Sequence, residues 1–193
     1  MKPEVLYIFD FDDTLAMTDS HVRVIRSDGQ IDRLDSRQFA AYRPHPGDDL
    51  DFSEFTEASG TLIDDTVEAM EEAINNHGID NVFIVTARSE PEPVSSFLTS
   101  MHVTAPEVIA TAGSPGKAKW LTRTLEEKSY NAVYVYEDCR KNISMLRDIV
   151  ELYNEDSGRA PVGYHAICIL PSGKQEIIEK LLREYIKSVL LVY

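Results

Sequence analysis

Cysteines and long apolar runs are scarce in this chain. Its 193 residues include only Cys139 and Cys168, with no CxxC pair. That spacing excludes a disulfide framework and favours a reducing compartment. The longest apolar runs, such as residues 189–192, are far too short to span a bilayer. Residues 1–4 lead directly into a strand-like segment, so we expect no signal peptide and a cytoplasmic protein.

Lysine and arginine are also few relative to the acidic residues. The chain has 19 Lys and Arg against 33 Asp and Glu, a net charge of −14. A field of this sign repels nucleic acid and acidic membranes at long range, but it favours cations wherever carboxylates converge. Hydrophobic residues make up 43% and charged residues 27%, as in ordinary globular proteins. The length suits a single domain over residues 1–193 with a small insert.

Several functional motifs are missing. Ser114-Pro115-Gly116 lacks the GK[ST] ending of a phosphate-binding P-loop, which argues against a kinase site. The five histidines have no metal-ligand spacing. The chain also has no internal repeat and no low-complexity tract. Function must therefore be sought in the acidic residues.

Apolar runs alternate with helix-like segments along most of the chain. Near-continuous apolar runs suit strands covered on both faces, and such runs lie at 5–9, 82–85, 107–110, 132–136 and 165–170. Helical spacing of apolar residues is found at 64–77, 92–101, 117–128, 139–153 and from about 174 onward. The alternation predicts an α/β protein with a Rossmann-like open parallel sheet of about five strands, flanked by helices.

Residues 16–60 interrupt this alternation. Apolar-alternating segments on either side of Ser27-Asp28-Gly29 predict a β-hairpin. Residues 37–42 suit one or two helical turns, whereas 44–47 and the acidic run 48–51 have the character of surface loop. The insert is either a flap or cap over a site, or only a long connection.

Chemically useful residues follow four of the predicted strands. Open parallel sheets bind ligands beyond the carboxyl ends of their strands. The residues found there are Asp10, Asp12, Asp13 and Thr14 after the first strand, Thr86 and Arg88 after the second, Lys117 after the third, and Glu137, Asp138 and Asn142 after the fourth. Carboxylates, hydroxyls and cations at one edge suit phosphoryl transfer. A carboxylate attacks phosphorus, a metal screens the repulsion between anions, and a second carboxylate moves protons.

In order and placement, these residues resemble the four motifs of the haloacid dehalogenase superfamily, over about residues 5–145. Phe9 to Leu15 matches the DxDxT motif, and Val85-Thr86 matches the second motif. Lys117 matches the third, and Glu137-Asp138 with Asn142 is similar to the fourth. Asp13 stands where many members have glycine, at a position that the motif leaves open.

The resemblance implies a role for each matching residue. Asp10 would be the nucleophile and a Mg²⁺ ligand, and Asp12 the general acid/base that also binds the metal through its backbone carbonyl. Asp138 would be the third protein ligand of the metal. Thr86 and Lys117 would bind the substrate phosphate, while Thr14, Glu137 and Asn142 would support the site. An acidic residue at position 12 resembles the phosphatases of the superfamily rather than its carbon–halogen hydrolases or ion pumps.

Two assignments have alternatives in the sequence. Lys119 competes with Lys117 for the phosphate, and we favour Lys117 because it opens the predicted helix. Arg88 resembles the TxR arginine of polynucleotide-end phosphatases, and would then also bind phosphate. Alternatively, it is a surface arginine paired with an acid such as Glu90.

The expected function is a Mg²⁺-dependent phosphatase that hydrolyses phosphomonoesters through an aspartyl phosphate. Its partner would be a phosphorylated small molecule or a nucleotide, and not a membrane. A polynucleotide-end phosphatase is an alternative, as is a phosphate-binding relative without turnover. The intact Asp10–Asp12 pair favours an enzyme, since a binder does not need the acid/base.

Overall fold

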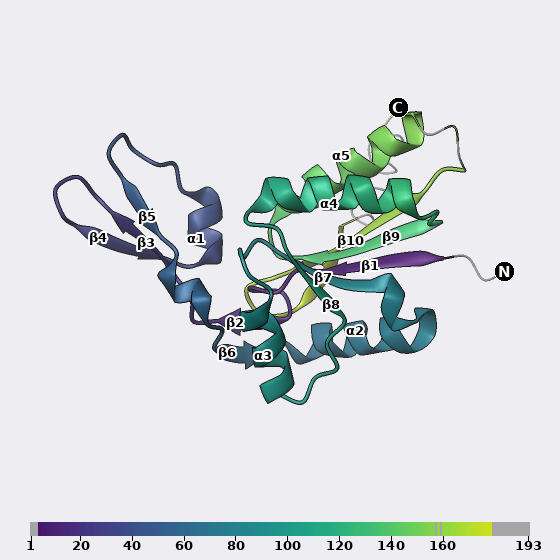
Figure 1. The fold of residues 1–193 in the computed structure, drawn as a ribbon, viewed down its shortest axis with the longest axis horizontal. Helices are drawn as coiled ribbons and strands as arrows, with labels where there is room; N and C mark the ends of the chain where they lie inside the picture. Colours follow the sequence, from purple (N-terminus) through teal and green to yellow (C-terminus); the bar gives the residue numbers. More distant parts are fainter. Residues whose placement is uncertain (1–3, 157, 159, 179–193) are drawn as a thin grey trace, which may run out of the picture.

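A six-stranded, mostly parallel sheet forms the centre of the protein (Figure 1). The computed structural model describes residues 4–156, 158 and 160–178. The strands lie in the order β11-β10-β9-β1-β7-β8, and only β11 is antiparallel. Their bounds are β1 Val5–Phe9, β7 Val82–Thr86, β8 Glu107–Ala110, β9 Ala132–Glu137, β10 Gly163–Ile169 and β11 Gln175–Ile177. The predicted Rossmann-like α/β sheet is confirmed.

Helices cover both faces of the sheet (Figure 1). One face carries α2 (Asp64–His77) and α3 (Glu92–Ser100), and the other carries α4 (Ser114–Glu127) and α5 (Arg140–Asp156). Strand β1 supplies both cores, because side chains alternate between the faces of a strand. Phe9 packs in the cluster with α2 and α3, while Leu6 and Ile8 pack with α4 and α5.

The central position of β1 aligns the strand ends that carry the candidate residues. Phe9 lies beside Ile84 of β7 and Tyr136 of β9 in parallel register. The Asp10 N–H then donates to the carbonyl oxygen of Tyr136 at 2.9 Å. Residues 10, 86 and 137 therefore leave the sheet at the same edge.

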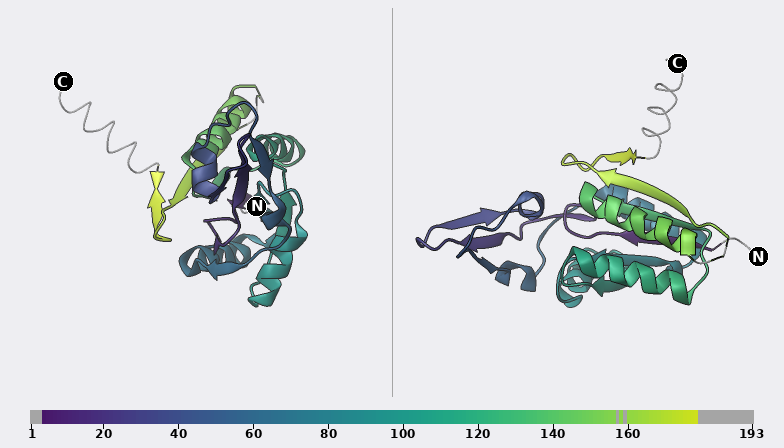
Figure 2. Two further views of the ribbon diagram at one scale, coloured as in Figure 1. Left: turned by 90° about the vertical axis from the view of Figure 1, so that its left-hand side faces the viewer. Right: turned by 90° about the horizontal axis from the view of Figure 1, so that it is seen from above.

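The insert forms a small cap beyond this edge (Figures 1 and 2). Its stem is an antiparallel pair, β2 (Ala16–Thr18) with β6 (Gly60–Leu62). Beyond the stem lies a three-stranded sheet in the order β4-β3-β5. Its strands are β3 Val22–Ile25, β4 Ile31–Leu34 and β5 Asp49–Asp51, and helix α1 (Ser36–Ala41) and the 3-10 turn η1 (Ser53–Thr56) complete the cap.

The predicted hairpin is present, and the turn explains it. Val22 to Ile25 pairs with Ile31 to Leu34, and Gly29 has a φ of 84°, a conformation that glycine adopts without strain. Helix α1 confirms the short helical segment. The expectation of a surface loop at 48–51 is wrong in part. Residues 49–51 form β5, because a third strand satisfies the open edge of β3.

The end of the chain departs from the prediction in the same way. Residues 175–177 form β11 rather than the start of a helix, since the turn at residues 171–173 returns the chain antiparallel to β10. Gly173, with a φ of 77°, allows this turn.

Most of the predicted last helix, 179–193, lies outside the described residues. Helix α4 begins at Ser114, three residues before the predicted start. Within the described part of the chain, no helix is long and apolar enough to cross a membrane.

Candidate active site

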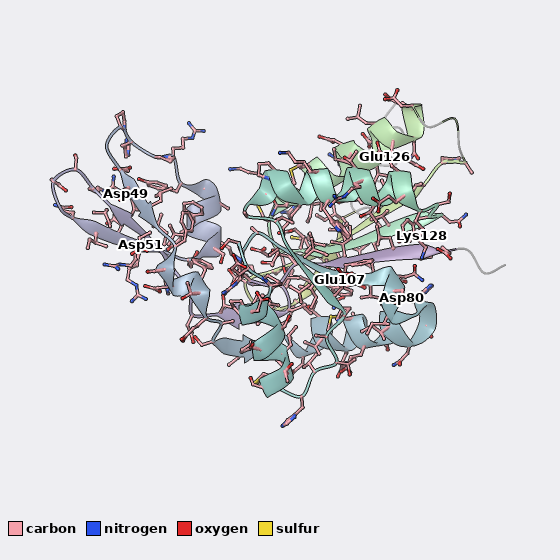
Figure 3. The ribbon with its side chains drawn as sticks, viewed as in Figure 1. Asp49, Asp51, Asp80, Glu107, Glu126 and Lys128 are labelled. Carbon is pink, nitrogen blue, oxygen red and sulfur yellow. The ribbon has the colours of Figure 1, made fainter. Side chains whose placement is uncertain are left out.

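A cavity of about 520 Å³ lies between the carboxyl edge of the central sheet and the cap. Asp10, Asp12, Glu137 and Asp138 line it from the core, and residues of α1 and η1 line it from the cap. Other acidic residues of the core, such as Asp80 and Glu107, lie far from the cap, near the amino ends of the strands (Figure 3). The strand-end carboxylates thus form a distinct group within an acidic protein.

Lys117 is buried between two carboxylates. Its Nζ lies 2.8 Å from Asp10 Oδ1 and 2.8 Å from Glu137 Oε2, and the residue is only 1% exposed. Gly116 permits this placement, since a Cβ there would lie 2.1 Å from the backbone oxygen of Thr111. Lys119 is on the exposed face of α4. The structure therefore brings Lys117, and not Lys119, to the site.

Glu137 is occupied by neighbouring donors. Besides Lys117, its carboxylate accepts hydrogen bonds from Asn142 Nδ2 at 3.1 Å and from the Cys139 N–H at 3.2 Å. These bonds use both carboxylate oxygens. Glu137 and Asn142 therefore hold Lys117 in place, which fits the supporting role that the sequence suggests for them.

Asp138 is held on two sides. Its backbone N–H donates to Thr14 Oγ1 at 3.1 Å, which ties the ends of β1 and β9 together. Its side chain accepts from Arg37 Nε of α1 at 3.2 Å. Arg37 also lies 3.9 Å from Asp13, which adopts a positive φ of 58°. Aspartate tolerates this conformation better than most residues, so Asp13 can occupy the turn without a glycine.

Arg88 binds the Asp12 carboxylate through two hydrogen bonds. Arg88 Nε donates to Asp12 Oδ2 at 3.0 Å, and Nη2 donates to Asp12 Oδ1 at 2.8 Å. Thr18 of the cap stem donates a further bond to Asp12 Oδ1 at 2.7 Å. Two parallel bonds from a planar guanidinium fix both the position and the plane of a carboxylate.

The remaining donors of Arg88 bind the cap. Nη1 donates to the carbonyl oxygens of Phe55 at 3.0 Å and Glu57 at 2.8 Å, and Nη2 also donates to Ser20 Oγ at 3.2 Å. A guanidinium has five N–H donors, and here each has a protein acceptor. The predicted pairing with Glu90 is not among these contacts. The phosphate-binding role of Arg88 stays a prediction, and its full set of partners weighs against it.

Thr86 closes β7 as predicted and is fully buried. Its Oγ1 accepts the Arg88 N–H at 3.2 Å, and its backbone oxygen accepts two bonds from Thr111, at 3.0 Å and 2.7 Å. Thr86 therefore fixes the loop that presents Arg88. Its binding of a phosphate stays a prediction.

Burial and like charge shift the carboxyl groups toward the protonated form. Burial, followed by the nearby Glu137, raises the pKa of Asp10 to about 8, against the opposing effect of Lys117. Burial and the charge of Asp10 raise the pKa of Asp138 to about 6. Burial alone would lower the pKa of Lys117, but Asp10 and Glu137 outweigh it and the pKa rises. Asp10 and Asp138 are therefore harder to ionise than ordinary carboxyl groups.

The cluster has an excess of negative charge. Three cations, Lys117, Arg37 and Arg88, pair with five carboxylates: Asp10, Asp12, Asp13, Glu137 and Asp138. Oxygens of Asp10, Glu137 and Asp138 lie within 4.8 Å of one another, close enough to hold one metal ion. Lys117 binds the Oδ1 atom of Asp10, and Arg37 binds the Oδ2 atom of Asp138, so each cation contacts one oxygen of its carboxylate. These residues fit a hard divalent cation, which prefers carboxylate oxygens and would balance the two extra charges.

The cap contributes residues that the sequence did not single out. Arg37 of α1 reaches Asp138, and its Nη2 is buried without a hydrogen-bond partner among the described residues. Phe39 of α1 and Phe52 and Phe55 around η1 line the cavity opposite the carboxylates. Their spacing carried no signal, because the fold of the cap depends on strand pairing between segments distant in the chain.

Comparison of the chain with known protein families, curated proteins and solved structures finds no significant match in any of the three. The site therefore has to be interpreted from its own residues and from the four motifs.

Proposed function

We propose that this protein is a divalent-cation-dependent phosphatase that hydrolyses phosphomonoesters through a phosphorylated Asp10. The observation that carries the proposal is the convergence of Asp10, Asp12 and Asp138 on one cavity, with Lys117 bound to Asp10 behind them, from three segments of the chain. Together with Thr86, their order along the chain is that of the four superfamily motifs. A phosphate-binding relative without turnover would have no use for a second cavity-lining carboxylate held in a fixed orientation.

Asp10 is placed to act as the nucleophile. In the first step its carboxylate oxygen attacks phosphorus, so that an Asp10–O–P bond forms while the P–O bond to the alcohol breaks. Lys117, 2.8 Å from Asp10, holds the carboxylate in place and supplies positive charge at the reacting end. Arg37, bound to Asp138 at 3.2 Å, adds positive charge behind the same cluster.

Asp12 is placed to move the proton in both steps. It lines the cavity, so it can protonate the leaving alcohol oxygen in the first step. In the second step it takes a proton from a water molecule, whose oxygen attacks phosphorus while the Asp10–O–P bond breaks and inorganic phosphate leaves. Arg88 and Thr18 keep its carboxylate in one orientation throughout.

Mg²⁺ is the cation that we propose for the site, with Asp10 and Asp138 as side-chain ligands and the backbone carbonyl of Asp12 as a further one. When bound, it would screen the repulsion between the Asp10 carboxylate and the substrate phosphate. The excess of carboxylates over cations in the cluster fits this requirement.

The proposal is tested by phosphate release from p-nitrophenyl phosphate with Mg²⁺ or with EDTA. We expect turnover with Mg²⁺, none with EDTA, and none in Asp10→Asn, which keeps the shape of the side chain. Phosphate hydrolysis without a catalyst is so slow that on the order of 20 kcal/mol must come from the site. Lys119→Ala, an exposed change on the same helix as Lys117, is the control. An Asp10→Asn variant with more than about a tenth of the wild-type rate would refute the role of Asp10.

A further inference from the structure

Three phenylalanines of the cap form an apolar wall opposite the carboxylates. Phe39 lies edge-on to Phe52 with ring centroids 5.5 Å apart, and Phe52 lies 6.3 Å from Phe55. All three line the cavity, and Phe52 is 46% exposed. The buried side chains of the three-stranded cap sheet are Val22 and Val24 instead. The rings are thus turned to the cavity and not used as core, which leaves apolar surface in contact with water.

From this wall we infer that the substrate is a small phosphomonoester that carries one flat aromatic ring and no second charged group. The inference rests on the proposed function and adds the part of the substrate that points away from the phosphate. A cavity of about 520 Å³ is within the usual range for a small-molecule site. One side of it presents the carboxylates of the proposed cation site, where the phosphate would bind through the cation, and the other offers aromatic faces and edges to a ring.

The charges around the cavity argue against a second anionic group on the substrate. In the described part of the chain, Arg88 is the only cation that lines the cavity, and its five donors already bind protein acceptors. Glu90, on the core loop after β7, also lines the cavity and would repel an anion. A diphosphate, or a chain end with a neighbouring phosphodiester, therefore lacks a partner for its second charge.

Phe55 contacts Arg88, whereas the ring contacts of Phe39 and Phe52 are to other aromatic side chains. The guanidinium carbon of Arg88 lies 5.0 Å from the Phe55 ring centroid, and the Phe55 carbonyl oxygen accepts a bond from the same group. A change at Phe55 would therefore disturb Asp12 through Arg88. Phe52 and Phe39 have no such tie, so they are the positions at which ring binding can be tested alone.

The test uses two pairs of phosphomonoesters whose leaving alcohols match within each pair. The first pair is 2-phenylethyl phosphate and n-butyl phosphate, and the second is thymidine 5′-monophosphate and ribose 5-phosphate. We expect kcat/KM to be about tenfold higher for the ring-bearing member, mainly through KM, because ring burial adds binding energy. A preference in either pair supports the inference and identifies the ring as a simple aryl group or a nucleobase. Equal values in both pairs overturn it.

Variants of the wall residues test whether Phe39 and Phe52 cause the preference for ring-bearing esters. Phe52→Ala and Phe39→Ala should each lower kcat/KM for the preferred ring-bearing ester by about three- to tenfold and leave its ring-free partner unchanged. Ile31→Ala removes an equally exposed apolar side chain of the cap (49% exposed) that does not line the cavity, so it should change neither. Equal losses on both esters would mean that the phenylalanines only support the cap.

A binding measurement separates this inference from the phosphatase proposal. Calorimetry with 2-phenylethylphosphonate and n-butylphosphonate, which cannot be hydrolysed, reports ring binding in the presence of Mg²⁺ without turnover. Tighter binding of the phenyl compound, lost in Phe52→Ala, supports the wall even if no ester is hydrolysed. Equal affinities would overturn the ring inference even if the protein proves to be a phosphatase.

Discussion

Arg88 connects Asp12 to the cap. Two of its nitrogens bind the Asp12 carboxylate at 3.0 Å and 2.8 Å, and the third binds the carbonyl oxygens of Phe55 and Glu57. Arg88 is 4% exposed, so this ion pair is shielded from solvent. The position of the proposed acid/base therefore depends on the position of the cap, which is also joined to the core by Arg37 through Asp138 and by Thr18 through Asp12.

This connection predicts the effect of removing Arg88. Arg88→Gln leaves the Asp12 carboxylate without its partner in a buried site, which typically costs about 3–5 kcal/mol of stability. We expect a matching fall in the free energy of unfolding, measured by urea denaturation. The double variant Asp12→Asn/Arg88→Gln carries no unpaired charge and should recover most of that loss. If the double variant is as unstable as the sum of the single ones, the pair is not coupled.

Asp12 itself should matter most for poor leaving groups. A positioned acid/base contributes roughly two to four decades in rate. We therefore expect Asp12→Ala to lower kcat on an alkyl phosphate by about that much. On p-nitrophenyl phosphate the loss should be smaller, because nitrophenolate leaves with little need of a proton. Equal losses on the two substrates would remove Asp12 from the acid role. Thr18→Val, which deletes only the hydroxyl bond to Asp12, is a milder matched change.

The strand-end residues were predictable, and the cap residues were not. Asp10 and Asp138 follow strongly apolar runs, and parallel strands bring such positions to one edge whatever the rest of the chain does. Arg37 and Phe52 lie in an insert whose short strands pair with segments distant in the chain. The local sequence pattern therefore did not predict where these two side chains lie. At Ile177, helical periodicity suggested a helix, but pairing with Ile167 of β10 prevailed.

Nucleic-acid ends should be poor substrates. On the cap, Arg23 and Arg33 lie opposite each other across β3 and β4, as a basic patch would require. Each is nevertheless paired with an acid, Arg23 with Asp51 at 3.0 Å and Arg33 with Glu54 at 2.9 Å, so neither leaves an excess of positive charge. We therefore expect a 3′-phosphorylated oligonucleotide to be hydrolysed no faster than the matching mononucleotide across a salt series. A strong preference for the oligonucleotide that weakens as salt rises would instead support a polynucleotide-end phosphatase.

The raised pKa values predict how pH controls stability and cation binding. The folded pKa of Asp10, about 8, lies above its ordinary value of 3.8, so the folded protein binds this proton more tightly than the unfolded chain. The stabilisation is full below about pH 4 and is lost as pH rises through 8. Asp138, with a pKa of about 6, adds a loss of the same sign at lower pH. Without divalent cations, these two groups should lower the melting temperature as pH rises from about 4 to about 8, with little further change above that.

Protons and Mg²⁺ compete for the same carboxylates, so the stabilisation by Mg²⁺ should grow with pH. We expect the rise in melting temperature caused by 10 mM Mg²⁺ (about the upper end of the millimolar range in which weak sites fill) to be larger at pH 8.5 than at pH 6. Asp10→Asn removes one of the raised carboxyl groups. It should flatten the fall in melting temperature with rising pH and lose most of the Mg²⁺ effect. The exposed change Asp80→Asn, at the other end of the core, should alter neither. A Mg²⁺ shift that is the same at both pH values, or that survives in Asp10→Asn, would place the cation elsewhere.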